Sequence, residues 1–143
     1  MEIILAENHG FCYGVKRAVE MANEAADSDG KSYTLGPIIH NPQVVGRLES
    51  KGVSPIQEVS DIDEGTMIIR SHGVGPAIYE EAEEKGLNIL DATCPHVKKA
   101  QQDAKSVIED RMTLVILGEK NHPEVKSINL WANNKGIIIE DEE

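Results

Sequence analysis

A cysteine-centred motif occurs twice in the chain, and its repetition constrains the fold more than any other feature of the sequence. Cys12 and Cys94 are each followed, three residues later, by a valine, then by two basic residues and an alanine. The cysteines are 82 positions apart, and other landmarks repeat at the same distance. Self-similarity at one fixed distance indicates tandem duplication of a structural unit. The other repeated landmarks are Leu35-Gly36 with Leu117-Gly118, His40 with His122, and Leu48 with Leu130.

The second copy is shorter than the first. At the offset of 82 positions, Glu143 corresponds to Asp61, so no residue of this chain corresponds to the stretch 66–73. We therefore expect a first unit over residues 1–93, containing one of the cysteines, and the first part of a second unit over residues 94–143.

Charge and composition exclude several classes of protein. A net charge of -11 and a pI near 4.9 argue against a nucleic-acid-binding surface, which needs a basic stripe. No apolar run is long enough to cross a bilayer, and the first residues lack a secretion signal, so we expect a cytoplasmic protein without a membrane partner. The two cysteines are then expected to be free thiols or ligands, and the absence of a CxxC motif argues against a closed zinc site.

Strand-like and helix-like segments alternate along the chain. The strands are mostly continuous apolar runs, which indicates a parallel sheet covered by helices on both faces. The sequence thus predicts an α/β fold built of tandem units with mostly parallel sheets, related by pseudo-symmetry. Strands are expected at 3–6, 33–35, 53–59, 66–70, 87–90, 114–117 and 137–139, and helices at 14–26, 42–51, 76–85, 95–108 and 124–131.

Five residues with metal-binding or acid-base side chains lie between a predicted strand and the helix that follows it. In parallel sheets, ligands bind outside the carboxyl ends of the strands, so these side chains are expected on one rim. Helix N-termini lower the pKa of cysteine and attract phosphate, and two thiolates with three imidazoles suit a metal cluster beside an anionic ligand. The five residues are Cys12, His40, His72, Cys94 and His122.

Other interpretations of the same residues stay open. A cysteine at a strand end is often a small buried hydrophobe, and an isolated histidine is often a surface residue or a helix cap. Glu124, two residues after His122, is a candidate proton donor whose protonation depends on desolvation and nearby charge. We interpret His9 and His96 as structural or solvated residues. The basic residues Lys16, Arg17, Lys98 and Lys99 are interpreted as exposed helix faces.

Five stretches of the chain resemble the amino-terminal part of the LytB-type 4-hydroxy-3-methylbut-2-enyl diphosphate reductases. This family has three αβα units around an iron–sulfur cluster. The resemblance implies that the second unit is incomplete here and that the third unit, a third cysteine and several threonine, serine and asparagine contacts are absent. The matching stretches are GFCYGVKRAV, LGPIIHNPQVV, IIRSHGVGP, LDATCPHVKKA and GEKNHPEV.

The resemblance also implies roles for individual residues. Cys12 and Cys94 would be two of three cysteine ligands of a [4Fe–4S] cluster, and Glu124 would deliver the proton that lets the substrate hydroxyl leave as water. The diphosphate would be held by His40, His72 and His122. The family converts the allylic alcohol diphosphate to isopentenyl and dimethylallyl diphosphate with two electrons and two protons, and the electrons would come from ferredoxin or flavodoxin.

Two alternatives to an iron–sulfur reductase follow from the incomplete ligand set. One is a cluster-free diphosphate-binding module in which the cysteines only pack. The other is an inactive fragment that dimerises through the face that further units would cover.

Overall fold

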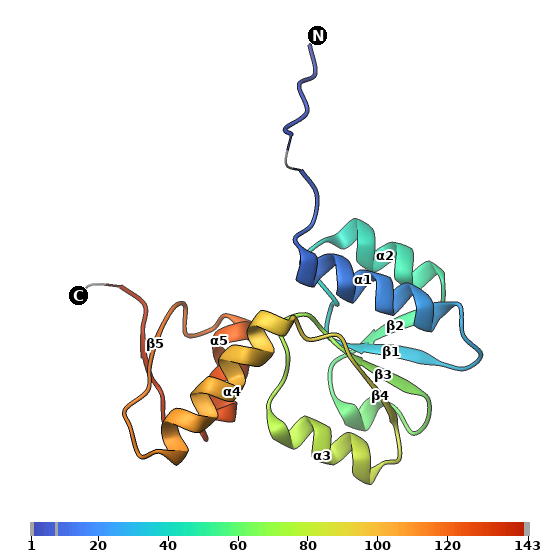
Figure 1. Ribbon diagram of the computed structural model, residues 1–143. Coiled ribbons are helices and arrows are strands. Elements are labelled where there is room, and N and C mark those ends of the chain that lie inside the picture. Colours follow the sequence, from blue (N-terminus) through green and yellow to red (C-terminus); the bar gives the residue numbers. More distant parts are fainter. Residues whose placement is uncertain (1, 8, 142–143) are drawn as a thin grey trace.

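The main sheet of the molecule consists of four parallel strands (Figure 1). The computed structural model describes residues 2–7 and 9–141. The strand order is β2-β1-β3-β4, and each connection crosses back over the sheet through a helical segment. This arrangement confirms the predicted α/β fold with a parallel sheet. The strands are β1 (Ser32–Leu35), β2 (Val53–Ile56), β3 (Thr66–Ile69) and β4 (Asn88–Asp91).

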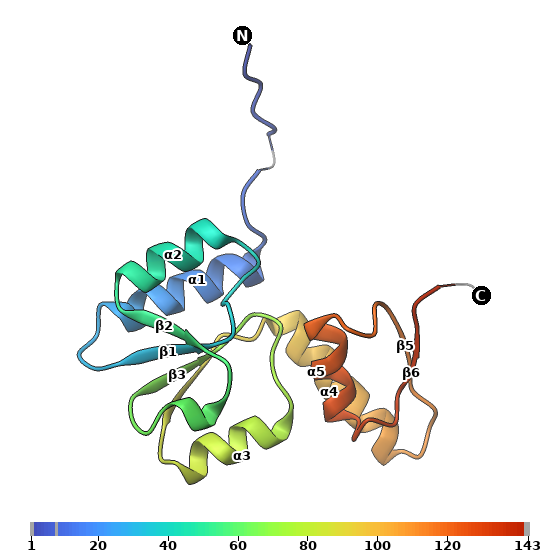
Figure 2. The same ribbon diagram turned by 180° about the vertical axis from the view of Figure 1, so that it is seen from behind.

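Helices cover both faces of this sheet, with α1 and α2 on one face and α3 on the other (Figures 1 and 2). Side chains of β3 alternate between the two layers. Ile68 belongs to the core under α1, whereas Met67 and Ile69 belong to the core above α3. Ala18 and Ala22 are fully buried, and their small side chains let α1 lie close to the sheet. The helices are α1 (Tyr13–Ala26), α2 (Pro42–Ser50), α3 (Pro76–Glu84) and the 3₁₀ helix η1 (Val59–Asp61).

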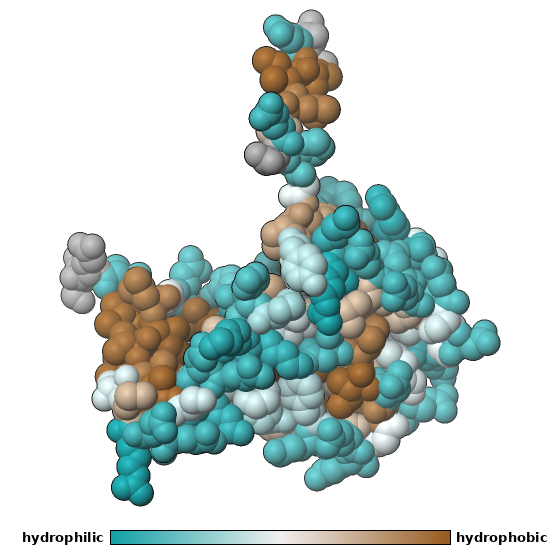
Figure 3. Space-filling model, in the orientation of Figure 1, coloured by the Kyte–Doolittle hydropathy of each residue, from teal (hydrophilic) through white to brown (hydrophobic). Residues whose placement is uncertain are grey.

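The second copy of the repeat forms a two-stranded parallel sheet with two helices on one of its faces. Ile116 points inward, whereas Val115 and Leu117 point outward together with Ile137 and Ile139 of the neighbouring strand, with which they pair in register. These four outward side chains form an exposed apolar strip on the left of Figure 3. The elements are α4 (Pro95–Glu109), β5 (Val115–Leu117), α5 (Pro123–Trp131) and β6 (Ile137–Ile139).

The strand expected over residues 3–6 does not form in the structure. Ile3, Ile4 and Leu5 are exposed and belong to no sheet, and Figure 1 shows this segment leading away from the rest of the chain. A strand needs the backbone of a neighbour to pair with, and the part of the chain that the structure describes offers no edge beside this segment. The other predicted elements form with boundaries shifted by up to three residues.

No helix among residues 2–7 and 9–141 combines the length and apolar character that crossing a bilayer requires.

The two methionines Met67 and Met112 provide a test of the core. Met67 is 0 % exposed at the centre of the main sheet, whereas Met112 is 55 % exposed in the loop before β5. We expect Met67→Ala to lower the free energy of unfolding by about 2–5 kcal/mol, because it leaves a cavity in a close-packed layer. Met112→Ala should change it by no more than about 0.5 kcal/mol. Urea unfolding followed by circular dichroism measures both, and similar losses in the two variants would contradict the assignment of the core.

Candidate functional site

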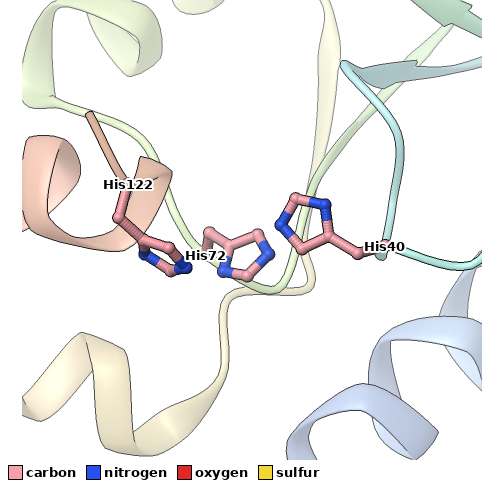
Figure 4. A group of neighbouring side chains, drawn as sticks. All are labelled: His40, His72 and His122. Atoms are coloured by element: carbon pink, nitrogen blue, oxygen red, sulfur yellow. The ribbon is translucent and has the colours of Figure 1, made fainter. Parts of the chain in front are cut away.

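Three histidines from distant parts of the sequence converge at one rim of the molecule (Figure 4). His40 follows β1, His72 follows β3 and His122 follows β5. The ring centroids of His40 and His72 are 4.7 Å apart, those of His72 and His122 are 5.5 Å apart, and those of His40 and His122 are 6.4 Å apart. One nitrogen from each ring lies within 4.8 Å of the others. Each histidine comes from the carboxyl end of a parallel strand, which places all three on the same rim.

His72 occupies the centre of this cluster and is the histidine most affected by its surroundings. Its side chain is only 16 % exposed, and its Nδ1 lies 3.8 Å from Oε2 of Glu124. Burial lowers the pKa of His72 below its ordinary value, and the proximity of His40 and Arg70 lowers this pKa further, while Glu124 acts in the opposite direction. The His72 ring is therefore mainly neutral near pH 7, and a negative charge placed beside it would raise its pKa.

His122 has a fixed orientation because it caps a helix. It is the N-cap residue of α5, and its Nδ1 accepts a hydrogen bond of 3.2 Å from the backbone N–H of Glu124. An imidazole that accepts through Nδ1 carries its hydrogen on Nε2. The free nitrogen of His122 is therefore a hydrogen-bond donor, as an anionic ligand requires.

Helix α5 also holds the loop that carries His72. The Ser127 hydroxyl lies 2.8 Å from the carbonyl oxygen of His72, and the side-chain amide of the buried Gln101 donates to the oxygen of this hydroxyl. One turn further along α5, Trp131 Nε1 donates a 2.9 Å hydrogen bond to the carbonyl of Val74. Because His122 is the N-cap of the same helix, these contacts fix the position of His72 relative to His122.

The two cysteines occupy matching positions at helix starts. Cys12 is the N-cap residue of α1 and Cys94 that of α4, and neither side chain makes a capping hydrogen bond. Both are free thiols, Cys12 exposed and Cys94 half-buried. The Cys94 sulfur lies against Gly14 in the first turn of α1, where an added side-chain carbon would overlap it. Cys94 is thus placed beside the helix that begins at Cys12, despite their separation in sequence.

Arg17 further ties these two segments together. From α1 it donates hydrogen bonds to the backbone carbonyls of Thr93, at 3.3 Å, and Asp91, at 3.4 Å, directly before Cys94. The Asp91 carboxylate in turn accepts from Lys98 Nζ at 2.6 Å. Burial acts to raise the pKa of Asp91, but hydrogen bonds from Lys98 and Thr93 outweigh it, so this pKa is lower than usual. The start of α4 is therefore anchored from both sides.

The interpretation of Arg17 as an exposed helix residue is therefore wrong, because Arg17 is half-buried. Lys98 is exposed, as expected, and also binds Asp91. A signal for Arg17 was available, because it follows Gly14 by three positions and so lies on the same face of α1. Nothing in the sequence indicated that Gln101 and Ser127 are buried and hydrogen-bonded, since polar residues inside helices are usually solvated. His9 is exposed, as expected, and its Nδ1 donates one local hydrogen bond to the carbonyl oxygen of Ala6.

Two helical glycines allow a matched test of how Cys94 is positioned. Gly14→Ala should displace the Cys94 side chain from α1 and speed its alkylation by iodoacetamide several-fold, because the added methyl occupies the space of the sulfur. Gly46→Ala in α2 should leave the rate unchanged, since nothing lies within 4 Å of the added carbon. Peptide mass spectrometry follows Cys12 and Cys94 separately. Equal Cys94 rates in all three proteins would contradict this packing.

Comparison with known proteins gives a consistent assignment. The model of the LytB protein family matches residues 3–143. A 4-hydroxy-3-methylbut-2-enyl diphosphate reductase of Geotalea uraniireducens (strain Rf4) is 52% identical over 139 residues, which are 97% of this chain and 49% of that protein. The corresponding enzyme of Geobacter sulfurreducens is 53% identical over the same length. The chain therefore spans about half the length of the curated relatives it matches.

Two solved structures extend this similarity to three dimensions. One, described as (E)-4-hydroxy-3-methyl-but-2-enyl diphosphate reductase, the terminal enzyme of the non-mevalonate pathway, has a TM-score of 0.84 at 49% identity and covers 97% of this chain and 51% of its own. The reductase of Plasmodium falciparum has a TM-score of 0.90 at 33% identity, over 94% of this chain and 43% of its own. The chain belongs to the LytB protein family.

Proposed function

We propose that this chain provides part of the active site of a 4-hydroxy-3-methylbut-2-enyl diphosphate reductase. The reaction adds two electrons and two protons to the allylic alcohol diphosphate, breaks its carbon–oxygen bond and releases water with isopentenyl or dimethylallyl diphosphate. The observation that carries the proposal is the convergence of His40, His72 and His122 beside Glu124. Relatives named for this activity, about half of whose length the chain matches, support it.

The histidine cluster suits a diphosphate because it combines donors with a site of proton uptake. His122 presents Nε2–H from a fixed ring, and the first turn of α5 adds the positive end of a helix dipole. His72, mainly neutral in the free protein, becomes charged when an anion binds next to it. Holding the diphosphate at this rim orients the rest of the substrate.

Glu124 is the proposed proton donor to the departing hydroxyl group. Its carboxyl group lies beside His72 Nδ1, and its side chain is 42 % exposed at the mouth of the cluster. A carboxyl group in this place donates its proton to the substrate oxygen as the carbon–oxygen bond breaks. His72 lies close enough to exchange a proton with this carboxyl group. The same helix start thus supplies one diphosphate ligand, His122, and the acid.

The cysteines fit an iron–sulfur cluster in their chemistry, although not in their number. Free thiols at the starts of α1 and α4 are favourable thiolate donors, because helix N-termini stabilise negative charge. A [4Fe–4S] cluster is commonly held by more cysteines than the two that this chain contains, so a further ligand must come from outside it. When bound, the cluster supplies electrons and a Lewis-acidic iron. We propose ferredoxin or flavodoxin as electron donor and the cytoplasm as location.

A cluster-free diphosphate-binding module is the second candidate. The observation that favours it is that this chain assembles three histidines by itself but supplies only two cysteines. The two candidates differ in the effect of cysteine substitution. A binding module retains its affinity for diphosphate in Cys12→Ser and Cys94→Ser and loses it in His40→Ala.

Iron incorporation tests the proposed role of the cysteines. The wild-type chain is reconstituted anaerobically with iron, sulfide and glutathione, and glutathione offers additional thiolates. The reconstituted chain should then show broad absorbance at about 400 nm. Cys12→Ser and Cys94→Ser should each lose most of it, because the helix-start thiolates anchor the cluster. If the variant that carries both Cys12→Ser and Cys94→Ser has the same iron content as the wild type, the support for a reductase is lost and the binding module is favoured.

Proton uptake tests the proposed role of His72. Its pKa lies below the ordinary value in the free protein, so binding of inorganic diphosphate near pH 7 should take up a fraction of a proton. The uptake should shrink as the pH falls below this pKa, where the ring is already charged. Titration calorimetry in two buffers of different ionisation enthalpy measures the uptake. His72→Asn should reduce it, and an unchanged value would exclude His72 as the group that is protonated.

A further inference from the structure

We infer that a cavity between the first unit and α5 is a second anion-binding site, separate from the histidine cluster and suited to a phosphate-bearing small molecule. The cavity has a volume of about 350 Å³ and lies on the α3 side of the loops that carry His72 and His122. None of the three clustered histidines lines it. The residues that carry the argument are Gly36, Arg70, Gly75, Asn121, Pro123 and Lys126.

The cavity wall is positively charged in an otherwise acidic protein. Arg70 and Lys126 line it and no carboxylate does, although the chain has 25 acidic and 14 basic residues. Within the described ranges, neither side chain has an acidic partner or a hydrogen bond, and Arg70 Nε is buried without an acceptor. Burying a guanidinium without a partner is costly, as the lowered pKa of Arg70 also reflects. An anion in the cavity lowers this cost by contacting the terminal nitrogens of the half-buried Arg70.

The backbone around the cavity contributes further positive potential. The N-cap residue of α3, Gly75, lines it and has no side chain to satisfy the free N–H groups of the helix, and Pro123 at the start of α5 lines it as well. The N-terminus of α3 thus opens on the same space as the two cations, whereas at the start of α5 Pro123 has no N–H and the N–H of Glu124 is bound by His122. Gly36 leaves room for the guanidinium on the other side, because a side-chain carbon there would lie 2.8 Å from an Arg70 terminal nitrogen.

Binding in this cavity stabilises the loops that present the histidines. Gly75 belongs to the β3–α3 loop that carries His72, and Asn121 and Pro123 flank His122 in sequence. A phosphate group held between Arg70 and Lys126 bridges the β3–α3 loop and α5, in addition to the hydrogen bonds from Ser127 and Trp131. Occupancy of the cavity therefore favours the geometry in which the histidine cluster binds its own ligand.

Calorimetric titration of the full chain with inorganic diphosphate, and separately with inorganic phosphate, tests the inference. We expect two classes of site for diphosphate at low salt. Lys126→Met should weaken one class about tenfold or more, because a charge-assisted hydrogen bond is lost, and should weaken the other class far less, only through the lost stabilisation of the histidine loops. Lys105→Met, which removes the same charge from the surface of α4 where Lys105 pairs with Glu109, should change neither class. Arg70→Met should repeat the effect of Lys126→Met, with circular dichroism as the check of folding.

The outcomes separate this inference from the proposed function. If the titration shows a single class of site and His40→Ala abolishes it, the inference of a second site is refuted and the proposed function is retained. Equal weakening by Lys126→Met and Lys105→Met would also overturn it, because the effect would be one of net charge. Loss of one class in Lys126→Met, with no effect of His40→Ala on the other, would support the second site and contradict the proposed function. If Lys126→Met weakens the binding of phosphate and of diphosphate by the same factor, one phosphate group is sufficient for binding in the cavity.

Discussion

The hydrogen bonds from α5 to the β3–α3 loop are the interactions on which the site depends. Ser127 binds the carbonyl of His72, and Trp131 binds the carbonyl of Val74. Together with the packing of Gly75 against Leu130, these hydrogen bonds hold His122 and Glu124 beside the histidines of the main sheet. Backbone carbonyls are suitable anchors for this purpose, because their positions are set by the strand that precedes them.

Pseudo-symmetry gives the two copies of the repeat the same landmarks but different local chemistry. His40 lies just before the N-cap Asn41, whose side chain accepts from the backbone N–H of Val44. His122 is itself the N-cap, so its ring is engaged by the helix it starts. The two histidines are equivalent in the repeat, yet one ring is exposed and uncommitted while the other has a fixed tautomer and orientation. The two equivalent positions of the repeat thus hold imidazoles of different character on one rim.

Much of the fold and part of the site could be predicted from the sequence. Continuous apolar runs indicated parallel strands, and helix starts such as Asn41-Pro42 were readable from capping preferences. The convergence of His40, His72 and His122 followed from their places after strands. The contact of Gly14 with Cys94 and the hydrogen bonds of Arg17 could not be foreseen, because they join segments far apart in sequence. Residues 3–6 were misassigned because an apolar run reveals strand propensity but not whether a neighbour is available to pair.

The outward strip of the two-stranded sheet has a practical consequence. Val115, Leu117, Ile137 and Ile139 expose branched aliphatic surface on short strands with free edges, which is a favourable template for intermolecular strand addition. Self-association of the chain is then expected to begin at this strip, independently of how firmly the main sheet is folded.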